Sequence, residues 1–168
     1  MLVKRFVLLY TNFMTLEGKI AQILINTRKT IAIAESCTGG HLSNRLTNIP
    51  GSSLFLKMAI VAYSNEAKIK ILKIPRWLIR QHGAVSQQVA IAMAKQARNM
   101  LDTDLGVGIT GIAGPSGGTK TKPVGLAYIA VCTQVESLCL GCHFRGTRSR
   151  IKNHATTRAL RLLYKFLS

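Results

Sequence analysis

Ser36 stands in the segment Ala34-Glu35-Ser36-Cys37-Thr38-Gly39-Gly40, where a predicted strand gives way to a predicted helix. The following glycines let backbone amides approach a ligand, and the N-terminus of the helix favours a developing oxyanion. These features indicate a nucleophile for acyl transfer. A serine or threonine that only caps the helix would leave the same local pattern, so that interpretation stays open here.

Cys37 is a rival nucleophile because it directly follows Ser36. A thiol at the N-terminus of a helix loses its proton readily, and the thiolate is the reactive form. Buried cysteines are nevertheless most often inert. The two nucleophiles therefore have to be separated by direct substitution.

A phenol and an amine occur together in the segment Tyr63-Ser64-Asn65-Glu66-Ala67-Lys68. Tyr63 is expected at the end of a strand and Lys68 one turn into a helix capped by Asn65, so both side chains can face one crevice. A lysine kept neutral by burial and a positive surround can serve as general base toward a serine. A solvated helix lysine is the alternative interpretation.

The segment Gly106-Val107-Gly108-Ile109-Thr110-Gly111 matches the glycine spacing of a dinucleotide-binding fingerprint. We reject that match because the glycines lie within a predicted strand that leads to a proline-containing loop instead of a helix. The loop, Gly111 to Gly118, also lacks the Gly-Lys-Ser/Thr ending of a P-loop. We interpret it as a mobile wall that offers amides to an anion.

The run Cys139-Leu140-Gly141-Cys142-His143 matches the attachment pattern of c-type haem. It lies in a predicted strand, and an export signal is not evident, so we do not expect haem. A zinc site would need two more ligands from distant residues such as Cys132 or His154, and a single cysteine pair is weak support. We therefore expect no metal.

The elements that must position these residues alternate between helix and strand through the first two thirds of the chain. Two consecutive strands near the end are expected to form a hairpin around residues 133–136, so the sheet should be mixed, with helices on both faces. Caps and periodicity predict helices that begin near Thr15, Gly39, Asn65, Pro75, Ser86 and Thr147, and strands at 30–34, 57–63, 105–110, 124–132 and 137–144.

Ligands of such sheets bind beyond the strand ends, which directs attention to three loops, 35–40, 64–68 and 111–118. A chain of 168 residues with 48% hydrophobic content can bury one sizeable core. We expect a single domain over 15–168, preceded by an extension of uncertain status, 1–14, with Met14 as an alternative start. Four cysteines without a convincing export signal favour a cytoplasmic location, and the absence of a long apolar run favours a soluble protein with no membrane partner.

The chain carries 23 Lys and Arg against 6 Asp and Glu, a net charge of +17, so its partners should include anions. A phosphorylated small molecule, nucleic acid and an acidic membrane would each be attracted. Few aromatic residues accompany the basic ones near the C-terminus, which favours phosphate contacts over base reading. These basic residues are Arg145, Arg148, Arg150, Lys152, Arg158, Arg161 and Lys165.

Four segments in order carry a resemblance to a known family. They are Ala34 to Gly40, Tyr63 to Lys68, His82-Gly83-Ala84-Val85-Ser86 and Gly111-Ile112-Ala113-Gly114-Pro115. Together they resemble the C-terminal amidohydrolase domain of the competence-damage protein CinA, known also as a stand-alone nicotinamide-nucleotide amidase. The resemblance runs from about Thr15 to Leu167.

The resemblance implies a three-layer α/β/α domain with a mixed sheet that is a homo-oligomer, dimer or trimer. It implies hydrolysis of the carboxamide of nicotinamide mononucleotide to nicotinate mononucleotide and ammonia, a step of NAD salvage, without metal or organic cofactor. Ser36 would be the nucleophile, Lys68 its base and Tyr63 a proton relay. The residues then expected to bind substrate are Thr38, Gly39, Gly40, Thr110, Gly111, Gly114 and Arg148.

The chain departs from the family pattern near its C-terminus. The family's Phe-x-Gly-Asp-Arg turn reads Phe144-Arg145-Gly146-Thr147-Arg148, which lacks the aspartate, and Lys152 and Ser116 also stand where other residues are common. These changes concern the phosphate-side contacts more than the nucleophile. The competing hypothesis is a catalytically degraded member that acts as a basic nucleic-acid-binding or interaction protein, with weak binding that is indifferent to sequence.

Overall fold

A computed structural model of the chain describes residues 15–168, so the predicted N-terminal extension, 1–14, lies outside the described residues. The expected alternation of helices and strands is found. The elements are α2 (Leu16–Thr27), β1 (Ile31–Glu35), α3 (His41–Thr47), a 3-10 turn η1 (Ser52–Leu54), β2 (Leu56–Val61), α4 (Asn65–Lys70), α5 (Arg76–His82), α6 (Gln87–Met100), β3 (Leu105–Gly111), β4 (Leu126–Cys132), β5 (Ser137–His143) and α7 (Arg148–Leu167).

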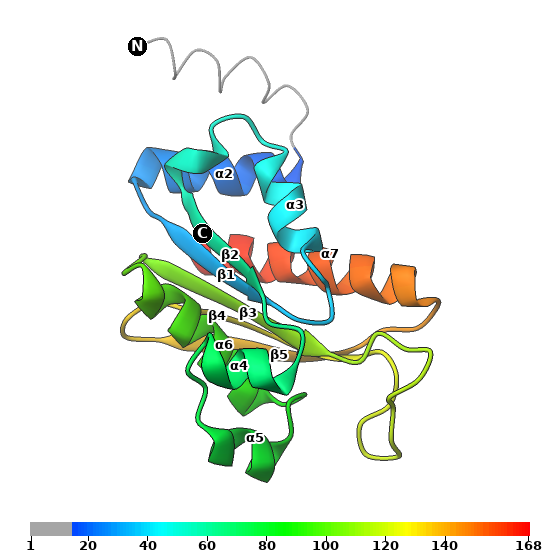
Figure 1. The fold of residues 1–168 in the computed structure, drawn as a ribbon. Helices are drawn as coiled ribbons and strands as arrows, with labels where there is room; N and C mark the ends of the chain where they lie inside the picture. Colours follow the sequence, from blue (N-terminus) through cyan, green and yellow to red (C-terminus); the bar gives the residue numbers. More distant parts are fainter. Residues whose placement is uncertain (1–14) are drawn as a thin grey trace.

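The strands form one mixed sheet in the order β2-β1-β3-β4-β5. β1 runs parallel to β2 and β3, whereas β4 runs antiparallel to β3 and β5. Helices α2, α3 and α7 cover one face, and α4, α5 and α6 lie on the other (Figure 1). The predicted three-layer α/β/α architecture and the hairpin between β4 and β5 are thereby confirmed. None of the helices in residues 15–168 is long and apolar enough to cross a membrane.

The apolar run 57–63 predicts a buried strand, and β2 differs from that prediction. It is the edge strand of the sheet, and its burial alternates, with Lys57, Ala59 and Val61 exposed. Within residues 15–168 β1 is the one strand that pairs with it, so its other edge has no neighbouring strand among these residues. The helix that follows also begins differently, because Ser64 rather than Asn65 is its cap, and the Ser64 Oγ accepts a hydrogen bond from the amide of Ala67 at 3.0 Å.

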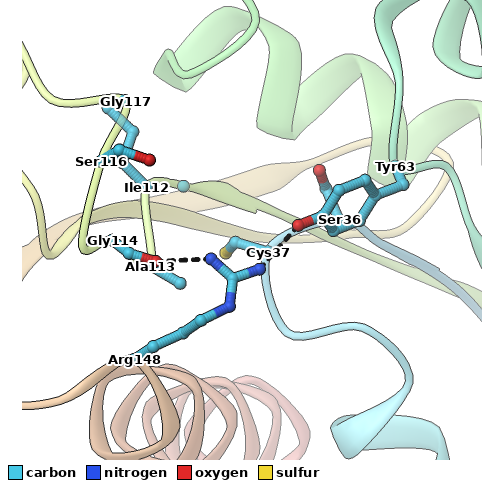
Figure 2. Close-up of a pocket in the computed structure, with 10 residues that line it drawn as sticks. Ser36, Cys37, Tyr63, Ile112, Ala113, Gly114, Ser116, Gly117 and Arg148 are labelled. Carbon is cyan, nitrogen blue, oxygen red and sulfur yellow. Dashed lines mark hydrogen bonds between the residues drawn. The ribbon is translucent and has the colours of Figure 1, made fainter.

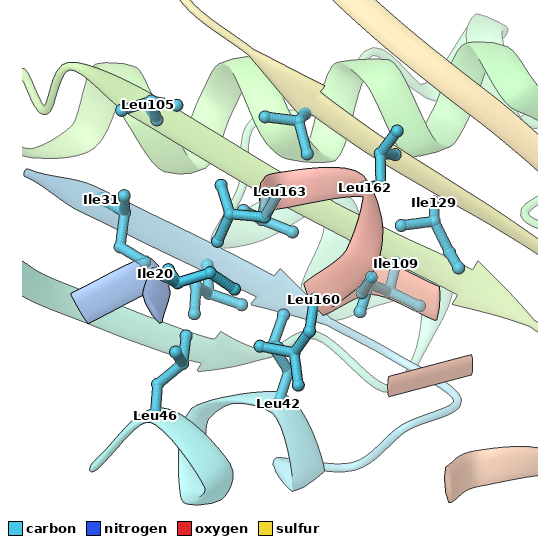
Figure 3. Close-up of a cluster of buried hydrophobic side chains, with 14 of the residues drawn as sticks. Ile20, Ile31, Leu42, Leu46, Leu105, Ile109, Ile129, Leu160, Leu162 and Leu163 are labelled. Atoms are coloured by element: carbon cyan, nitrogen blue, oxygen red, sulfur yellow. The ribbon is translucent and has the colours of Figure 1, made fainter. Parts of the chain in front are cut away.

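Each face of the sheet carries its own apolar core. Ile31, Leu42 and Leu163 belong to the larger cluster, between the sheet and α2, α3 and α7 (Figure 3). On the other face Met93 and Leu72 belong to a smaller cluster, and a third cluster between α6 and β4 extends this core with Ala90, Ala94, Ala130 and Cys132. Burial of an apolar side chain contributes about 1.5–3 kcal/mol, so the two cores together fix both helical layers against the sheet.

The buried face of α6 agrees with the sequence prediction except at its end. Val89, Met93 and Ala97 are fully buried, as expected. The apolar spacing predicts that Met100 or Leu101 completes this face, but the two residues are 42% and 54% exposed. The helix ends at Met100, and the chain turns there toward β3.

The glycines of β3 are explained by the close packing of α6. A Cβ on Gly106 would lie 2.0 Å from the carbonyl oxygen of Ala94, and one on Gly108 would lie 2.2 Å from that of Ala90. No side chain fits between the strand and the helix at these positions. The fingerprint-like spacing therefore reflects contact between helix and strand, which agrees with its rejection as a dinucleotide site.

Candidate active site

The turn that carries Ser36 is held by the residue before it. Glu35 ends β1 and is fully buried, and its carboxylate accepts hydrogen bonds from the amides of Gly40, Leu42 and Ser43 at 3.0, 3.2 and 2.9 Å. The Ser43 hydroxyl adds a fourth at 2.5 Å. The carboxylate thus occupies the N-terminus of α3, where negative charge is favourable. The chain between Glu35 and Gly40 is closed into a short loop that presents Ser36.

This arrangement changes the expectation for the oxyanion-binding amides. The Gly40 amide is taken by Glu35, and the Gly39 amide donates to the carbonyl oxygen of Ser36 at 3.1 Å. Burial raises the pKa of the Cys37 thiol, and the backbone amides of Cys37 and Thr38 oppose that rise with a smaller lowering effect. Thr38 is itself buried, and its hydroxyl has no hydrogen-bond partner within residues 15–168.

Lys68 meets Ser36 beneath the turn. It lies on α4 with 2% of its surface exposed, and its Nζ is 3.0 Å from the Ser36 Oγ. The same nitrogen donates to the carbonyl oxygens of Ala62 at 2.8 Å and Tyr63 at 3.4 Å. The alternative of a solvated helix lysine is therefore wrong for this residue.

Burial lowers the pKa of the Lys68 ammonium, because desolvation penalises its charged form. A second expected cause, repulsion by neighbouring cations, is not what acts here. The charge effect at Lys68 comes from the ionised form of Cys37, which raises the pKa of Lys68 and is smaller than the effect of burial.

A cavity of about 250 Å³ opens in front of Ser36. Among the predicted site residues it brings together Ser36, Tyr63, Gly111, Gly114 and Arg148. Gly39 and Gly40 lie on the turn outside this lining, and Lys68 lies behind Ser36. The lining also includes Cys37, the rival nucleophile, and four residues that the sequence predictions did not name as site residues: Ile112, Ala113, Ser116 and Gly117 (Figure 2).

Arg148 spans the cavity from the start of α7. Its guanidinium donates to the carbonyl oxygen of Gly114 at 2.6 Å and to the hydroxyl of Tyr63 at 2.7 Å (Figure 2). The side chain thereby bridges the glycine loop and the segment that follows β2. The Tyr63 ring is 61% exposed, and its hydroxyl is bonded to Arg148 rather than to Lys68. The proton relay expected between Tyr63 and Lys68 is not formed by a direct hydrogen bond.

Thr110 and Gly111 support the floor of the cavity. The Thr110 hydroxyl donates to the carbonyl oxygen of Ala84 at 2.8 Å, so it ties the end of β3 to the segment before α6 and does not line the cavity. A Cβ on Gly111 would lie 2.9 Å from the Cys37 sulfur. Gly111 therefore leaves the space that the Cys37 side chain occupies.

Cys37 lines the cavity, but its chemistry is unfavourable. The residue is 8% exposed, and burial raises the pKa of its thiol to about 11. At neutral pH the sulfur is therefore protonated, and the reactive thiolate is scarce. The geometry favours Ser36 as the nucleophile.

The cysteine pair on β5 is poorly placed for one metal ion. Cys139 and Cys142 are three residues apart on a strand, so their side chains point to opposite faces of the sheet. In the part of the chain that the structure describes, no three His, Cys, Asp or Glu side chains are grouped to hold a metal.

Comparisons with known proteins agree with this geometry. The CinA C-terminal domain family matches residues 14–167. A CinA-like protein of Syntrophus aciditrophicus is 47% identical over 155 residues, which cover 92% of this chain and 37% of that protein. The chain thus spans little more than a third of that relative.

Solved structures match over most of their length. The competence or damage-inducible protein of Enterobacter asburiae has a TM-score of 0.88 and 31% identity, covering 91% of this chain and 96% of that chain. The competence/damage inducible protein of Agrobacterium tumefaciens gives 0.86 and 32%, with coverage of 91% and 96%. With the strand order, the Ser36 turn and the buried Lys68 in place, these matches show that the chain belongs to the CinA C-terminal domain family.

Proposed function

We propose that the chain is an amidohydrolase that converts nicotinamide mononucleotide to nicotinate mononucleotide and ammonia. The observation that carries the proposal is the 3.0 Å contact between the buried amine of Lys68 and the hydroxyl of Ser36, beside an open cavity. A nucleophile within hydrogen-bond reach of a base is the arrangement that acyl transfer needs. The resemblance described above supplies the substrate.

The contacts of Lys68 suit a neutral amine as well as an ammonium ion. A neutral amine has two N–H donors and one lone pair. The carbonyl oxygens of Ala62 and Tyr63 can accept the two donors, which leaves the lone pair for the hydroxyl proton of Ser36. Burial, which lowers the pKa of Lys68, increases the neutral fraction.

In the proposed reaction the Ser36 oxygen attacks the carboxamide carbon while its proton passes to Lys68. The amides of Cys37 and Thr38 are our candidates to hold the oxyanion, because those of Gly39 and Gly40 are bonded elsewhere. When the tetrahedral intermediate collapses, Lys68 returns the proton to the nitrogen and ammonia leaves. Water then attacks the acyl-serine, gives up a proton to Lys68, and releases the acid as the Ser36 hydroxyl forms again.

The nucleotide phosphate is assigned to the Arg148 side of the cavity. A cavity of about 250 Å³ is small beside the roughly 300–1,000 Å³ of most ligand sites. Arg148 crosses the space, and a phosphate can replace the Tyr63 hydroxyl and the Gly114 carbonyl as its partner. Release of Arg148 would enlarge the site and free Tyr63 to approach the leaving group.

The test is release of ammonia and appearance of nicotinate mononucleotide when purified protein is given nicotinamide mononucleotide. We expect Ser36→Ala to abolish turnover and Cys37→Ser, the adjacent matched change, to keep most of it. Thiol-alkylating reagents should be poor inhibitors. A folded Cys37→Ser protein without activity beside an active Ser36→Ala protein would overturn the serine mechanism, and a wild-type protein that releases no ammonia would overturn the proposed function.

A further inference from the structure

A second hollow, of about 590 Å³, lies between β5 and α7. None of its lining residues lines the cavity at Ser36. β5 is the last strand of the sheet, and no other strand in the described part of the chain covers its outer edge. We call this hollow the basic groove; its walls include His143, Phe144, His154, Thr157, Arg158 and Arg161.

A row of basic side chains continues the basic groove along α7. The row consists of Arg150, His154, Arg158, Arg161 and Lys165, all exposed. Their spacing of three or four residues places them on one face of the helix. At 1.5 Å per residue the row is about 22 Å long.

No acidic side chain on α7 neutralises the positive charge of this row. α7 contains no Asp or Glu. The ion pairs formed within residues 15–168 join Arg45 to Glu17, Lys70 to Glu66 and Arg98 to Asp102, so none involves α7. The positive potential of the row is therefore available to a ligand.

The shape and composition of the surface select among anionic partners. A second copy of this chain docked through the same surface would place its own row of cations against this one. Helices that bind a membrane surface carry exposed apolar residues for insertion, and no large exposed apolar side chain lies on α7. Peptides gain affinity by burying anchor side chains in pockets, whereas this groove is walled mainly by charged, histidine and small residues.

We propose that the basic groove and the α7 row bind the phosphodiester backbone of nucleic acid without reading its sequence. A length of about 22 Å spans about six phosphates of one strand of a duplex, at roughly 3.4 Å each. Phe144, the aromatic residue of the groove, is half-buried and packs against His154, with ring centroids 6.0 Å apart. The groove therefore offers charge and lacks an open stacking platform.

The experiment measures binding of a labelled duplex of about 20 base pairs by fluorescence anisotropy, at about 50 to 200 mM salt. With four permanent cations in the row, the affinity of the unmodified chain should fall about 150-fold over this range. For Arg158→Glu/Arg161→Glu the fall should shrink to about 12-fold, because each lost phosphate contact lowers the logarithmic salt slope by about one.

The matched control is Arg76→Glu/Arg80→Glu on α5, which makes the same charge change at exposed positions outside the groove. It should keep the salt dependence of the unmodified chain. Deamidation of nicotinamide mononucleotide and the melting temperature report whether each protein is folded, and neither depends on DNA. Equal losses of DNA affinity in the two double variants would overturn the proposal. Binding of polyglutamate or anionic lipid vesicles that depends on Arg158 and Arg161 and is tighter than binding of DNA would also overturn it.

Discussion

Three oxygen atoms, from Ser36, Ala62 and Tyr63, surround the side-chain nitrogen of Lys68 on α4. A side chain so placed can supply either charge or basicity. The two roles can be separated by pH and by substitution with arginine, because an arginine keeps the charge but cannot accept a proton near neutral pH.

We predict that Lys68→Arg is nearly as damaging to turnover as Lys68→Ala. Burial lowers the pKa of Lys68 below its ordinary value of about 10.4, so activity of the unmodified chain should rise with pH as Lys68 loses its proton and fall on the acid side. The measurement is a kcat/KM profile against pH for all three proteins. A Lys68→Arg protein with substantial activity would show that the residue supplies charge.

Glu35 gives a second prediction, since its carboxylate holds three amides and a hydroxyl at the start of α3. Glu35→Gln removes the charge and one acceptor, so it should lower the free energy of unfolding by about 1.5–3 kcal/mol. It should also reduce kcat more than it changes KM, because the Ser36 turn loses its support. Denaturant titration and steady-state kinetics measure the two effects.

The control for Glu35 is Glu66→Gln on α4. The Glu66 side chain is 70% exposed and pairs with Lys70 on the surface, so its loss should cost less than about 1 kcal/mol and leave kcat unchanged. Similar effects of the two changes would contradict a positioning role for Glu35.

Among the elements, α6 and β3 pack closely against each other, and glycine makes this contact possible. Gly108→Ala would place a methyl group 2.2 Å from the Ala90 carbonyl oxygen, against backbone that cannot rotate away. We expect destabilisation of about 1–3 kcal/mol or more. Gly141→Ala on β5 is the control, because its methyl would meet the edge of the Tyr128 ring at 3.1 Å, a side chain able to shift. Thermal melting of both proteins checks the difference.

The order and type of the helices and strands could be predicted because each element has a local signal in the sequence. Thr15, for example, caps α2, and its Oγ1 accepts from the Gly18 amide at 3.2 Å. The edge position of β2 was not predictable, because strand order depends on how distant segments pack. The Arg148 bridge was hidden for the same reason: its partners lie 34 and 85 residues away along the chain. Glu35 was visible in its motif, but its bonds to α3 needed the folded turn.

At the scale of the whole molecule, exposed apolar side chains suggest self-association. Val61, Ile71 and Trp77 are 46%, 50% and 61% exposed, and they lie along β2, after α4 and on α5. Such exposure often marks contact surfaces. We predict a dimer or trimer, with a mass near two or three times the 18.4 kDa of one chain in light scattering after gel filtration. A single species at 18.4 kDa would contradict this prediction.

Because Lys68 is buried, the free energy of unfolding also depends on pH. In the unfolded chain the amine titrates near 10.4, whereas burial lowers its pKa in the folded chain, so between these two values unfolding takes up protons. Stability therefore rises with pH across that window. The heat of unfolding should include the ionisation heat of the buffer that supplies the protons. Calorimetry in buffers of different ionisation enthalpy should show this dependence, and Lys68→Met should reduce it.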